Sequence, residues 1–446
     1  MSTGTLRHSV AIAVTAALLA SCAGAAAQNS STDQNIIGYG PNPTLPKPRT
    51  GLVPTVNIAN AKGWPKGRQP QPAKGLRVNA FARNLDHPRW IHVLPNGDVL
   101  VAETNAPAKH DAGFSLKKVF EGQAMRQAGA ATASANRITL LRDTNGDGVA
   151  DVRKVFAEGL NSPFGMTLSE GKLYVADTDA LLAFPYSDGQ MRANGPPQKI
   201  VDLPAGSINH HWTKDVIASP DGRKLYVTVG SNSNVGENGI AAEQNRAAVL
   251  EVDKASGRAR LFATGLRNPN GLSWNPESGK LWVSVNERDE LGDDLVPDYM
   301  TSLRDGGFYG WPYSYFGQHV DPRVKPQRLD LVAKAIKPDY ALGSHTASLG
   351  MTFLKGASLG PAYANGAFVG QHGSWNRSVH SGYKVIFVPF RNGEPDGLPK
   401  DVLTGFLDRD GKAMGRPVGV AIDKTGALLV ADDVGNAIWR VSRGGR

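Results

Sequence analysis

Two adjacent histidines, His210 and His211, lie in residues 207–215 (SINHHWTKD), just before the apolar run 216–218. Imidazole is the usual general base near neutral pH because its unperturbed pKa is about 6.5. Neighbouring side chains of an extended segment point in opposite directions, so we expect His211 to face a site and His210 to be a packing or supporting residue. A lone histidine is more often structural than catalytic, and that alternative stays open for His211.

Arg267 and Asn268 lie side by side in residues 265–271 (GLRNPNG). A planar, always charged guanidinium beside an amide suits an oxyanion or a quinone oxygen. The alternative is that Arg267 pairs with a carboxylate and locks a loop. Residues 371–377 (QHGSWNR) offer further donors, and their Trp375 is either an apolar face of the site or a core aromatic.

Two acidic stretches suggest calcium. Residues 143–151 (DTNGDGVAD) carry oxygen ligands at alternate positions, but Lys154 stands where an EF-hand needs its bidentate Glu, so a plain hairpin turn is the alternative. Residues 286–294 (NERDELGDD) could offer carbonyls or carboxylates to a hard cation, and the alternative there is a solvated acidic loop.

The elements that must position these groups repeat along the chain. A short apolar strand, a turn containing Gly and a second strand of Leu-x-Val type are typical of a β-hairpin. The pattern recurs at residues 93–101, 168–175, 219–227, 275–283, 363–369 and 423–430. The spacing leaves room for a four-stranded sheet per repeat, which predicts an all-β fold, a six-bladed β-propeller over residues 76–446. The two long intervals predict insertions at about 105–135 and 287–345.

The repeat also predicts which loops meet. The loop before the first strand of each blade lies at the mouth of the central channel of a propeller, where pockets form. Polar residues at equivalent places in several blades should therefore converge in one basic, imidazole-rich ring. Its candidates are Arg89, His211, Arg267, His345 and Arg416.

Residues 1–27 have the pattern of a signal peptide, with Arg7 and His8 before an apolar run too short to span a bilayer as a mature helix. Cys22, the only cysteine, follows Leu-Ala-Ser and resembles the modified cysteine of a bacterial lipobox. We expect a periplasmic or cell-envelope protein with a lipid anchor at Cys22 as its membrane link, and a soluble secreted form is the alternative. Residues 28–75 are expected to be a tether with little structure of its own.

Composition excludes several classes of function. The chain has 49 Lys and Arg against 40 Asp and Glu, but no basic run interleaved with aromatics, so nucleic-acid binding is not expected. It contains no Gly-x-Ser-x-Gly elbow, P-loop, dinucleotide fingerprint or zinc-spaced His/Cys cluster. Redox chemistry would therefore need a bound cofactor that is neither NAD nor haem, and a separate electron acceptor, a cytochrome or a quinone.

The sequence resembles the pyrroloquinoline quinone (PQQ) dependent sugar dehydrogenases over residues 76–443, and within them the L-sorbosone dehydrogenase branch. The resemblance rests on His211 followed by residues 219–222 (SPDG), on residues 265–271, on the acidic loop 286–294 and on residues 306–312 (GGFYGWP). It implies a six-bladed propeller that oxidises a small sugar or a sugar-derived aldehyde.

The resemblance also implies roles for single residues. The histidine matching His211 removes the proton from the substrate hydroxyl while hydride passes to the quinone carbon, and the arginine matching Arg267 polarises the quinone oxygen. Asn268 and Arg416 match cofactor contacts, and Arg89, His345 and Arg377 are the further cofactor-binding candidates. Calcium should bind the backbone carbonyls of Glu287 and Arg288.

The chain departs from the family pattern in three places. Glu287 and Arg288 replace Gly-Pro in the calcium loop, so the Glu287 carboxylate is a further candidate ligand. The basic residue of the fifth blade aligns near Asn376 and Arg377, and Arg377 is taken as its match. His210 replaces an acid, so something else must orient His211.

Two alternatives of other classes remain. A calcium-dependent lactonase or related hydrolase can use the same architecture, because fold does not fix function. It would need carboxylates from several blades converging on the metal. A non-catalytic binding propeller is the second alternative.

Overall fold

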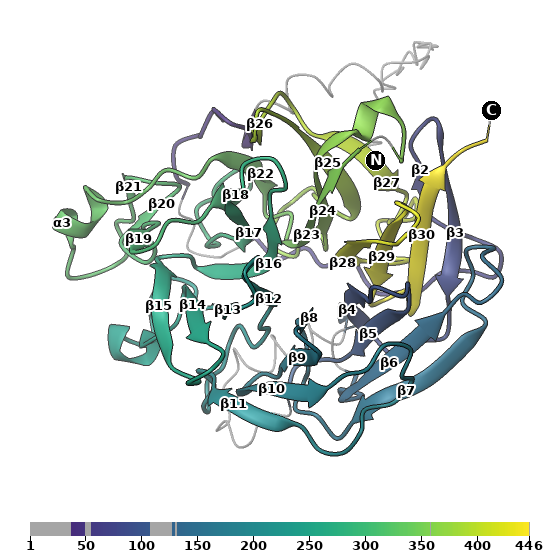
Figure 1. Cartoon of the computed structure of the whole chain (residues 1–446). Helices are drawn as coiled ribbons and strands as arrows, with labels where there is room; N and C mark the ends of the chain where they lie inside the picture. Colours follow the sequence, from purple (N-terminus) through teal and green to yellow (C-terminus); the bar gives the residue numbers. More distant parts are fainter. Residues whose placement is uncertain (1–36, 50–54, 108–126, 130–131, 357, 446) are drawn as a thin grey trace, which may run out of the picture.

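The fold is a six-bladed β-propeller, as the hairpin repeat predicts (Figure 1). The computed structural model describes residues 37–49, 55–107, 127–129, 132–356 and 358–445. In this part of the chain nearly every regular element is a strand, and antiparallel sheets are arranged around a central axis. Most neighbouring strands within a blade are consecutive in the chain, which keeps connections short; the exceptions among the larger strands are β22 (Tyr340–Ser344) in blade 4 and β3 (Leu76–Ala82) in blade 6.

The first three blades occupy the N-terminal half of the propeller. Blade 1 contains β4 (Pro88–Val93), β5 (Val99–Glu103), β6 (Arg137–Arg142) and β7 (Val152–Glu158). Blade 2 contains β8 (Met166–Ser169), β9 (Lys172–Ala176), β10 (Ala180–Pro185) and β11 (Gln198–Asp202). Blade 3 contains β12 (Val216–Ala218), β13 (Lys224–Val229), β14 (Ala248–Asp253) and β15 (Ala259–Thr264), with β19 (Gly307–Phe308) added in parallel at its edge.

The other three blades recruit strands from the N-terminal region. Blade 4 contains β16 (Asn268–Trp274), β17 (Leu281–Asn286), β18 (Pro297–Ser302), β22 (Tyr340–Ser344) and the edge strand β1 (Tyr39–Gly40). Blade 5 contains β23 (Ser348–Lys355), β24 (Asn365–Gln371), β25 (Lys384–Arg391), β27 (Lys400–Thr404) and β2 (Gln71–Pro72), and β26 (Glu394–Pro395) pairs with β25. Blade 6 contains β28 (Pro417–Ile422), β29 (Leu428–Asp432), β30 (Ala437–Arg443) and β3 (Leu76–Ala82).

Blade 6 closes the ring with strands from both ends of the propeller. β3 pairs antiparallel with β30, with Leu76 opposite Arg443 and Val78 opposite Val441. A propeller leaves only short, protected strand edges, and here the N-terminal strand is tied down by a C-terminal one. Pairing of residues 76–82 with residues 438–443 therefore closes the ring.

Glycines let the inner strands approach one another at the axis. A Cβ built on Gly350 of β23 would lie 2.4 Å from the backbone oxygen of Val418 in the next blade, and one on Gly271 would lie 2.5 Å from the nitrogen of Met351. Neither distance can be accommodated by a side chain, because the contacting atoms are backbone. The glycines in these inner strands therefore allow the channel mouth to be narrow.

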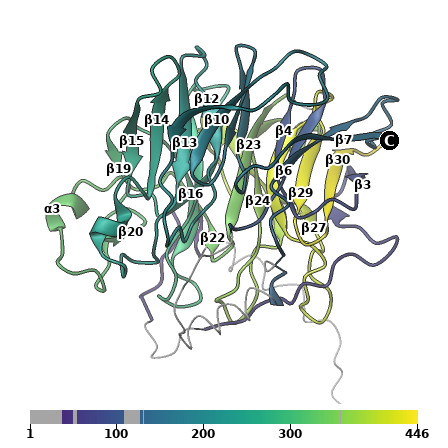
Figure 2. The ribbon, with the colours of Figure 1, turned by 90° about the horizontal axis from the view of Figure 1, so that it is seen from below.

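Two details of the predicted repeat differ from the structure. Gly366 lies inside β24 and not in a turn, because the chain between β23 and β24 runs through η2 (Pro361–Tyr363). The interval 287–345 is not one insertion, since it contains β18 and β22 of blade 4. The inserted part is 303–339, with β19, β20 (Ser314–Tyr315), β21 (His319–Val320) and α3 (Leu329–Val332), and its β20 and α3 project beyond the blades (Figure 2).

The segment expected to be a tether is packed on the propeller from residue 37 onward wherever the structure describes it. β1 pairs with β22, β2 pairs with β27, and Ala59 is buried in the core of blades 5 and 6. Most of the other predicted insertion, 105–135, lies outside the described residues, as do the signal peptide 1–27 and Cys22. Among the described residues, no helix combines the length and the apolar character needed to cross a membrane.

Candidate active site

His211 is held by the segment that follows β13. Its Nδ1 lies 2.8 Å from the backbone oxygen of Ser231 and 3.1 Å from the Ser231 hydroxyl. That hydroxyl donates its own proton to the backbone oxygen of Ser233 at 2.6 Å. Both Ser231 oxygens can therefore only accept from Nδ1, so Nδ1 carries the proton and Nε2 presents its lone pair.

The environment of His211 keeps the imidazole neutral. Burial lowers its pKa well below 6.5, and the nearby positive charge of Arg267 lowers it further. A neutral ring with Nε2 as the acceptor is the form that a general base requires. His210, whose ring lies edge-on to that of His211 at 4.6 Å between centroids, is exposed and not a packing residue, because residues 210–211 form a bend and not an extended segment.

Gly230 brings Asn268 close to His211. A Cβ on Gly230 would lie 2.4 Å from Oδ1 of Asn268 and 2.5 Å from Cβ of His211. Only a residue without a side chain fits between the two. The two candidate residues therefore lie on either side of one glycine after β13.

Arg267 is buried at the start of β16 and is already bonded. Its Nη1 donates to the backbone oxygen of Glu287 at 2.8 Å, and its Nη2 donates to Oδ1 of Asn234 at 3.1 Å and to Asp289 at 3.2 Å. The backbone nitrogen of Ser231 donates to the Arg267 oxygen at 2.8 Å, which ties Arg267 to the residue that orients His211. The pairing with a carboxylate, which sequence reasoning weighed as an alternative, is present.

Asp289 connects three of the loops at the mouth. Besides Arg267, it accepts from Nδ2 of Asn376 at 2.6 Å and lies 3.3 Å from Nδ1 of His345. Burial raises the pKa of Asp289, but Arg267 and His345 outweigh burial and hold it at about 2. We call Arg267, Asp289, His345 and Asn376 the Asp289 cluster.

His345 belongs to this cluster as a cation. Its Nε2 lies 2.9 Å from the backbone oxygen of Gly292, so both ring nitrogens face acceptors. Burial lowers its pKa, but the hydrogen bond and the charge of Asp289 prevail, and the pKa is raised. Both ring nitrogens have partners within the protein. His345 therefore contributes positive charge to the mouth rather than a hydrogen bond to a ligand.

A second cluster lies around Asp433, which follows β29. Oδ2 of Asp433 accepts from Arg89 at 3.0 Å and from Nε2 of His372 at 2.8 Å, and His87 lies 3.6 Å away. Burial raises the pKa of Asp433, but these neighbours hold it well below its usual range. We call His87, Arg89, His372 and Asp433 the Asp433 cluster.

The Asp433 cluster reaches the loop of His211 through Arg89. The guanidinium of Arg89 lies 5.7 Å from the ring centroid of Trp212, the residue after His211. Arg416 lies beside the cluster, with Nη1 bonded to the backbone oxygen of His372 at 3.4 Å and Nη2 to that of Ala59 at 3.0 Å. Arg89, Arg267 and Arg416 are thus each held by hydrogen bonds within the protein.

Several buried polar atoms at the mouth have no hydrogen-bond partner among the described residues. They include His87 Nε2, Asn268 Oδ1, and the Nε atoms of Arg89, Arg267 and Arg416. Buried polar atoms are almost always satisfied, so a group of unpaired buried polar atoms indicates a missing ligand. Three of these atoms are guanidinium donors, which fits a cofactor that carries carboxylates.

The predicted calcium loop offers a less complete site. Within the described residues, no three His, Cys, Asp or Glu side chains gather to hold a metal ion. The Glu287 oxygen accepts from Arg267, and the carboxylate of this buried residue has its pKa raised by burial to about 7. The side chain of Arg288 is buried 2.9 Å from Asp321 in the inserted segment, so only its backbone oxygen remains a candidate ligand.

Arg377, Trp375 and the stretch 143–151 differ in their outcomes. Arg377 bonds the backbone oxygens of Asp293 and Val379 and the carboxylate of Asp294, whereas its neighbour Asn376 reaches the Asp289 cluster. Trp375 is 46% exposed and is not a core aromatic.

The carboxylates of 143–151 bond their own turn, for example Asp143 with the nitrogens of Gly146 and Gly148, as a plain hairpin turn would.

Sequence reasoning missed Ser231, Asn234, Asp289 and Asp433. Asp289 was part of the acidic loop but had been considered only for a metal. Asp433 carries a detectable signal, because it directly follows β29, the second strand of its blade. Acidic residues also end the second strands of blades 1 and 6, at Glu103 and Asp432. Ser231 and Asn234 carry none, since serine and asparagine are ordinary loop residues.

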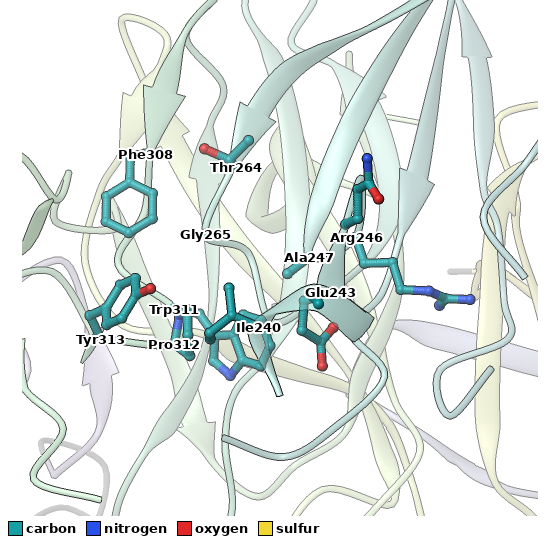
Figure 3. A pocket seen from close by; sticks show the side chains of 12 residues that line it. Ile240, Glu243, Arg246, Ala247, Thr264, Gly265, Phe308, Trp311, Pro312 and Tyr313 are labelled. Carbon is teal, nitrogen blue, oxygen red and sulfur yellow. The ribbon is translucent and has the colours of Figure 1, made fainter. Parts of the chain in front are cut away.

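An open pocket of about 440 Å³ lies between residues 240–247 and residues 308–313 (Figure 3). Its lining combines Phe308, Trp311 and Tyr313 of the inserted segment with Glu243 of η1 (Ile240–Glu243) and Arg246. Trp311 donates through Nε1 to the backbone oxygen of Asn234 at 2.9 Å. The pocket therefore shares a wall with the residues that hold Arg267.

The fold and the mouth together define a class: a six-bladed propeller with a neutral histidine and a ring of arginines at one end of its channel. The family model described as "Domain of unknown function (DUF7133)" matches residues 73–376, more than half of the sequence, and the chain belongs to this family. A second family model, "TrAA12-like", matches residues 327–444.

The chain is also similar to individual proteins and to solved structures. An uncharacterized protein of Borreliella burgdorferi is 28% identical over 65% of this chain and 78% of its own. A pyrroloquinoline quinone-dependent pyranose dehydrogenase of Coprinopsis cinerea is 24% identical over 86% of this chain, which spans only 56% of that longer protein. The holo form of the PQQ domain of a Coprinopsis cinerea pyranose dehydrogenase superposes with a TM-score of 0.68, 20% identity and coverage of 87% of this chain and 100% of that one. The predicted resemblance to PQQ-dependent sugar dehydrogenases is confirmed.

Proposed function

We propose that this protein is a PQQ-dependent dehydrogenase that oxidises a sugar or a sugar-derived aldehyde of the aldose or L-sorbosone type. One observation carries the proposal: His211 is fixed as a neutral base beside the buried Arg267, in a mouth where the Nε donors of Arg89, Arg267 and Arg416 lack partners among the described residues. The relatives named as PQQ-dependent sugar dehydrogenases supply the cofactor and the substrate class.

His211 would take the proton of the substrate hydroxyl through Nε2. For an aldehyde the hydroxyl is that of its hydrate, so one base serves both substrates. PQQ, when bound, supplies the two-electron oxidant that the side chains themselves lack. Arg267, held by Glu287, Asn234 and Asp289, presents fixed positive charge that costs no reorganisation during the reaction.

Arg89, Arg267, Asn268 and Arg416 would hold the cofactor. Buried guanidinium groups recognise carboxylates through charge-assisted hydrogen bonds. His345 would act from within the Asp289 cluster, and Arg377 would act by holding the 293–294 loop, because its donors are used there. An analogue of PQQ without carboxylates should therefore bind more weakly than PQQ. A change of sugar substrate should affect the affinity for the cofactor less.

We propose calcium at the backbone oxygens of Glu287 and Arg288. A carbonyl oxygen has two lone pairs, so the bond from Arg267 leaves one for a cation. The Glu287 carboxylate is a third candidate ligand from the same loop. Titration of the apo protein with calcium, with and without PQQ, tests this site, and equal PQQ binding in excess chelator would contradict it.

The cell location and the redox partner are further proposals. The signal pattern of residues 1–27 supports a periplasmic or cell-envelope protein that is anchored through a lipid at Cys22 and passes electrons to a separate cytochrome or quinone. Cell fractionation of wild type and C22A tests the anchor. Wild type should be in the membrane fraction and C22A in the soluble one, whereas the same distribution for both would exclude lipidation.

Dye reduction by the purified apo protein decides the activity. PQQ plus calcium should produce turnover with aldoses or L-sorbosone, and omission of PQQ should abolish it. Hydrolysis of a lactone without PQQ would instead indicate the lactonase alternative, and no activity with any substrate would indicate a binding propeller. The lactonase is disfavoured because the described mouth residues are mostly arginine and histidine and show no converging group of three metal-ligating side chains.

A further inference from the structure

The segment 231–234 is the common support of the candidate active site. Ser231 accepts from His211 through its backbone oxygen and donates to the Arg267 oxygen through its nitrogen. Three residues later, Asn234 accepts from Arg267 at 3.1 Å and from the Asp289 nitrogen at 2.8 Å. Any shift of this segment would therefore move both the base and its neighbouring cation.

Nothing in the sheet fixes this segment, because β13 ends at Val229. Its backbone groups are buried and must find partners outside strand pairing. Glu243 bonds the segment at two points: its Oε2 accepts from the backbone nitrogen of Asn232 at 2.7 Å, and its Oε1 accepts from the side-chain hydroxyl of Ser233. Glu243 is itself 9% exposed and lines the open pocket together with Trp311 (Figure 3).

We propose that Glu243 is the positioning residue for His211. It acts through the segment 231–234 and does not touch the imidazole. With both carboxylate oxygens bonded, the segment is held so that the Ser231 oxygen meets Nδ1, and Nε2 is left as the base. Position 210, where relatives are expected to carry an acid, is a histidine here. The carboxylate that supports His211 is instead that of Glu243, which acts from the opposite side of the segment 231–234.

The effect of Glu243→Gln follows from its donors and acceptors. A glutamine accepts one hydrogen bond through its oxygen, but its amide NH2 then faces the second donor, the Asn232 nitrogen or the Ser233 hydroxyl. One buried donor is left unpaired, and the segment must shift to relieve it. Ser233→Ala is the second variant: it leaves the bond from the Asn232 nitrogen to Glu243, and it removes the bond from the Ser233 hydroxyl to Glu243 and the one from the Gly236 nitrogen to that hydroxyl.

The first readout needs no cofactor. In the apo protein, 15N NMR of the His211 ring, assigned by its absence in a His211→Asn variant, should show the proton on Nδ1 in wild type. Glu243→Gln should give a mixture of the two tautomers. The proposal is overturned if wild type carries the proton on Nε2, or if Glu243→Gln leaves the wild-type tautomer unchanged.

The second readout is kinetic and rests on the proposed function. In the loaded enzyme Glu243→Gln should lower kcat on the order of 10-fold with little change in KM, since misplacement of the base affects the chemical step. Ser233→Ala should also lower kcat. If wild type itself shows no turnover, the proposed function fails, while the NMR result still judges the role of Glu243.

A matched control separates positioning from stability. Glu251 is a buried carboxylate of the same blade, 7% exposed, and it pairs with Lys224 and Arg260 away from the mouth. Glu251→Gln should lower the melting temperature without changing the His211 tautomer or kcat. If Glu251→Gln changes both as Glu243→Gln does, the effect is general destabilisation and the proposal is wrong.

Discussion

Nδ1 of His211 lies 2.8 Å from the backbone oxygen of Ser231, and this one contact decides which ring nitrogen can act as a base. The acid that relatives are expected to carry before the histidine is His210 here, so a backbone oxygen takes over the orientation of the ring. A carbonyl orients an imidazole without adding charge, and the pKa of His211 accordingly stays low.

Replacement of His211 should remove catalysis and spare cofactor binding. In His211→Ala we expect kcat to fall about 100-fold or more, the usual loss for a general base. The dissociation constant for PQQ, measured by fluorescence titration, should change little. His210→Ala, at the exposed neighbouring position, is the control and should keep near-normal turnover. Full turnover of His211→Ala with PQQ and calcium would show that the base is another group.

The pH dependence of activity should reflect the lowered pKa of His211. The base works only when neutral, and burial together with Arg267 lowers its pKa well below 6.5. Activity should therefore persist as the pH falls through 6.5 and be lost only at lower pH. A pH profile of kcat/KM measures this. If the loss of activity at low pH is assigned to His211 and has its midpoint at or above pH 6.5, the prediction is wrong.

Gly230 should not tolerate a side chain. In Gly230→Ala the new Cβ would meet Oδ1 of Asn268 at 2.4 Å and Cβ of His211 at 2.5 Å. We expect kcat to fall on the order of 100-fold, because both residues must move. The control is Gly279→Ala, at a turn with no atom within 4 Å but a φ of 68°, which should cost about 1 kcal/mol of stability and no activity. Equal activity losses in the two variants would argue against a specific role of Gly230.

Asp289→Asn should weaken the cluster that it organises. Removal of its charge leaves Arg267 and His345 without their carboxylate, and breaking a buried ion pair costs about 3 kcal/mol in the free energy of unfolding. The pKa of His345 should fall, because Asp289 is the group that raises it. Urea unfolding and an NMR titration of His345 measure the two effects. An unchanged pKa of His345 would mean that the 3.3 Å contact carries little interaction energy.

His92 should make stability depend on pH. Nε2 of His92 accepts from the nitrogen of Leu168 at 3.3 Å, which joins blades 1 and 2, and burial lowers the pKa of His92 to about 4. Between about pH 6.5 and 4 the unfolded chain binds a proton that the folded chain does not, so stability falls as the pH falls. The loss should be on the order of 2 kcal/mol and absent in His92→Gln. Urea unfolding at pH 7 and at pH 4.5 compares the two proteins, and equal pH dependence in both would exclude His92 as the cause.

Much of the architecture could be predicted because hairpins are local. The turn glycines at 97, 171, 222, 279 and 426 do separate the first two strands of their blades. Gly366 was misplaced because a 3-10 turn took over its connection. The tether expectation for residues 28–75 rested on composition, which does not report the pairing of β1 with β22 or of β2 with β27.

The sequence by itself determined the six blades and the resemblance to the PQQ-dependent sugar dehydrogenases, and it predicted that arginines and histidines from five loops meet at one end. Only the tertiary structure decided which side chains are paired. Asp289 reaches Asn376 across 87 positions, and Asp433 reaches Arg89 across 344. Contacts of that separation depend on ring closure and leave no spacing pattern. For the same reason the histidine pair could suggest a base at His211, but the choice of its nitrogen came from Ser231, which lies 20 residues further along the chain.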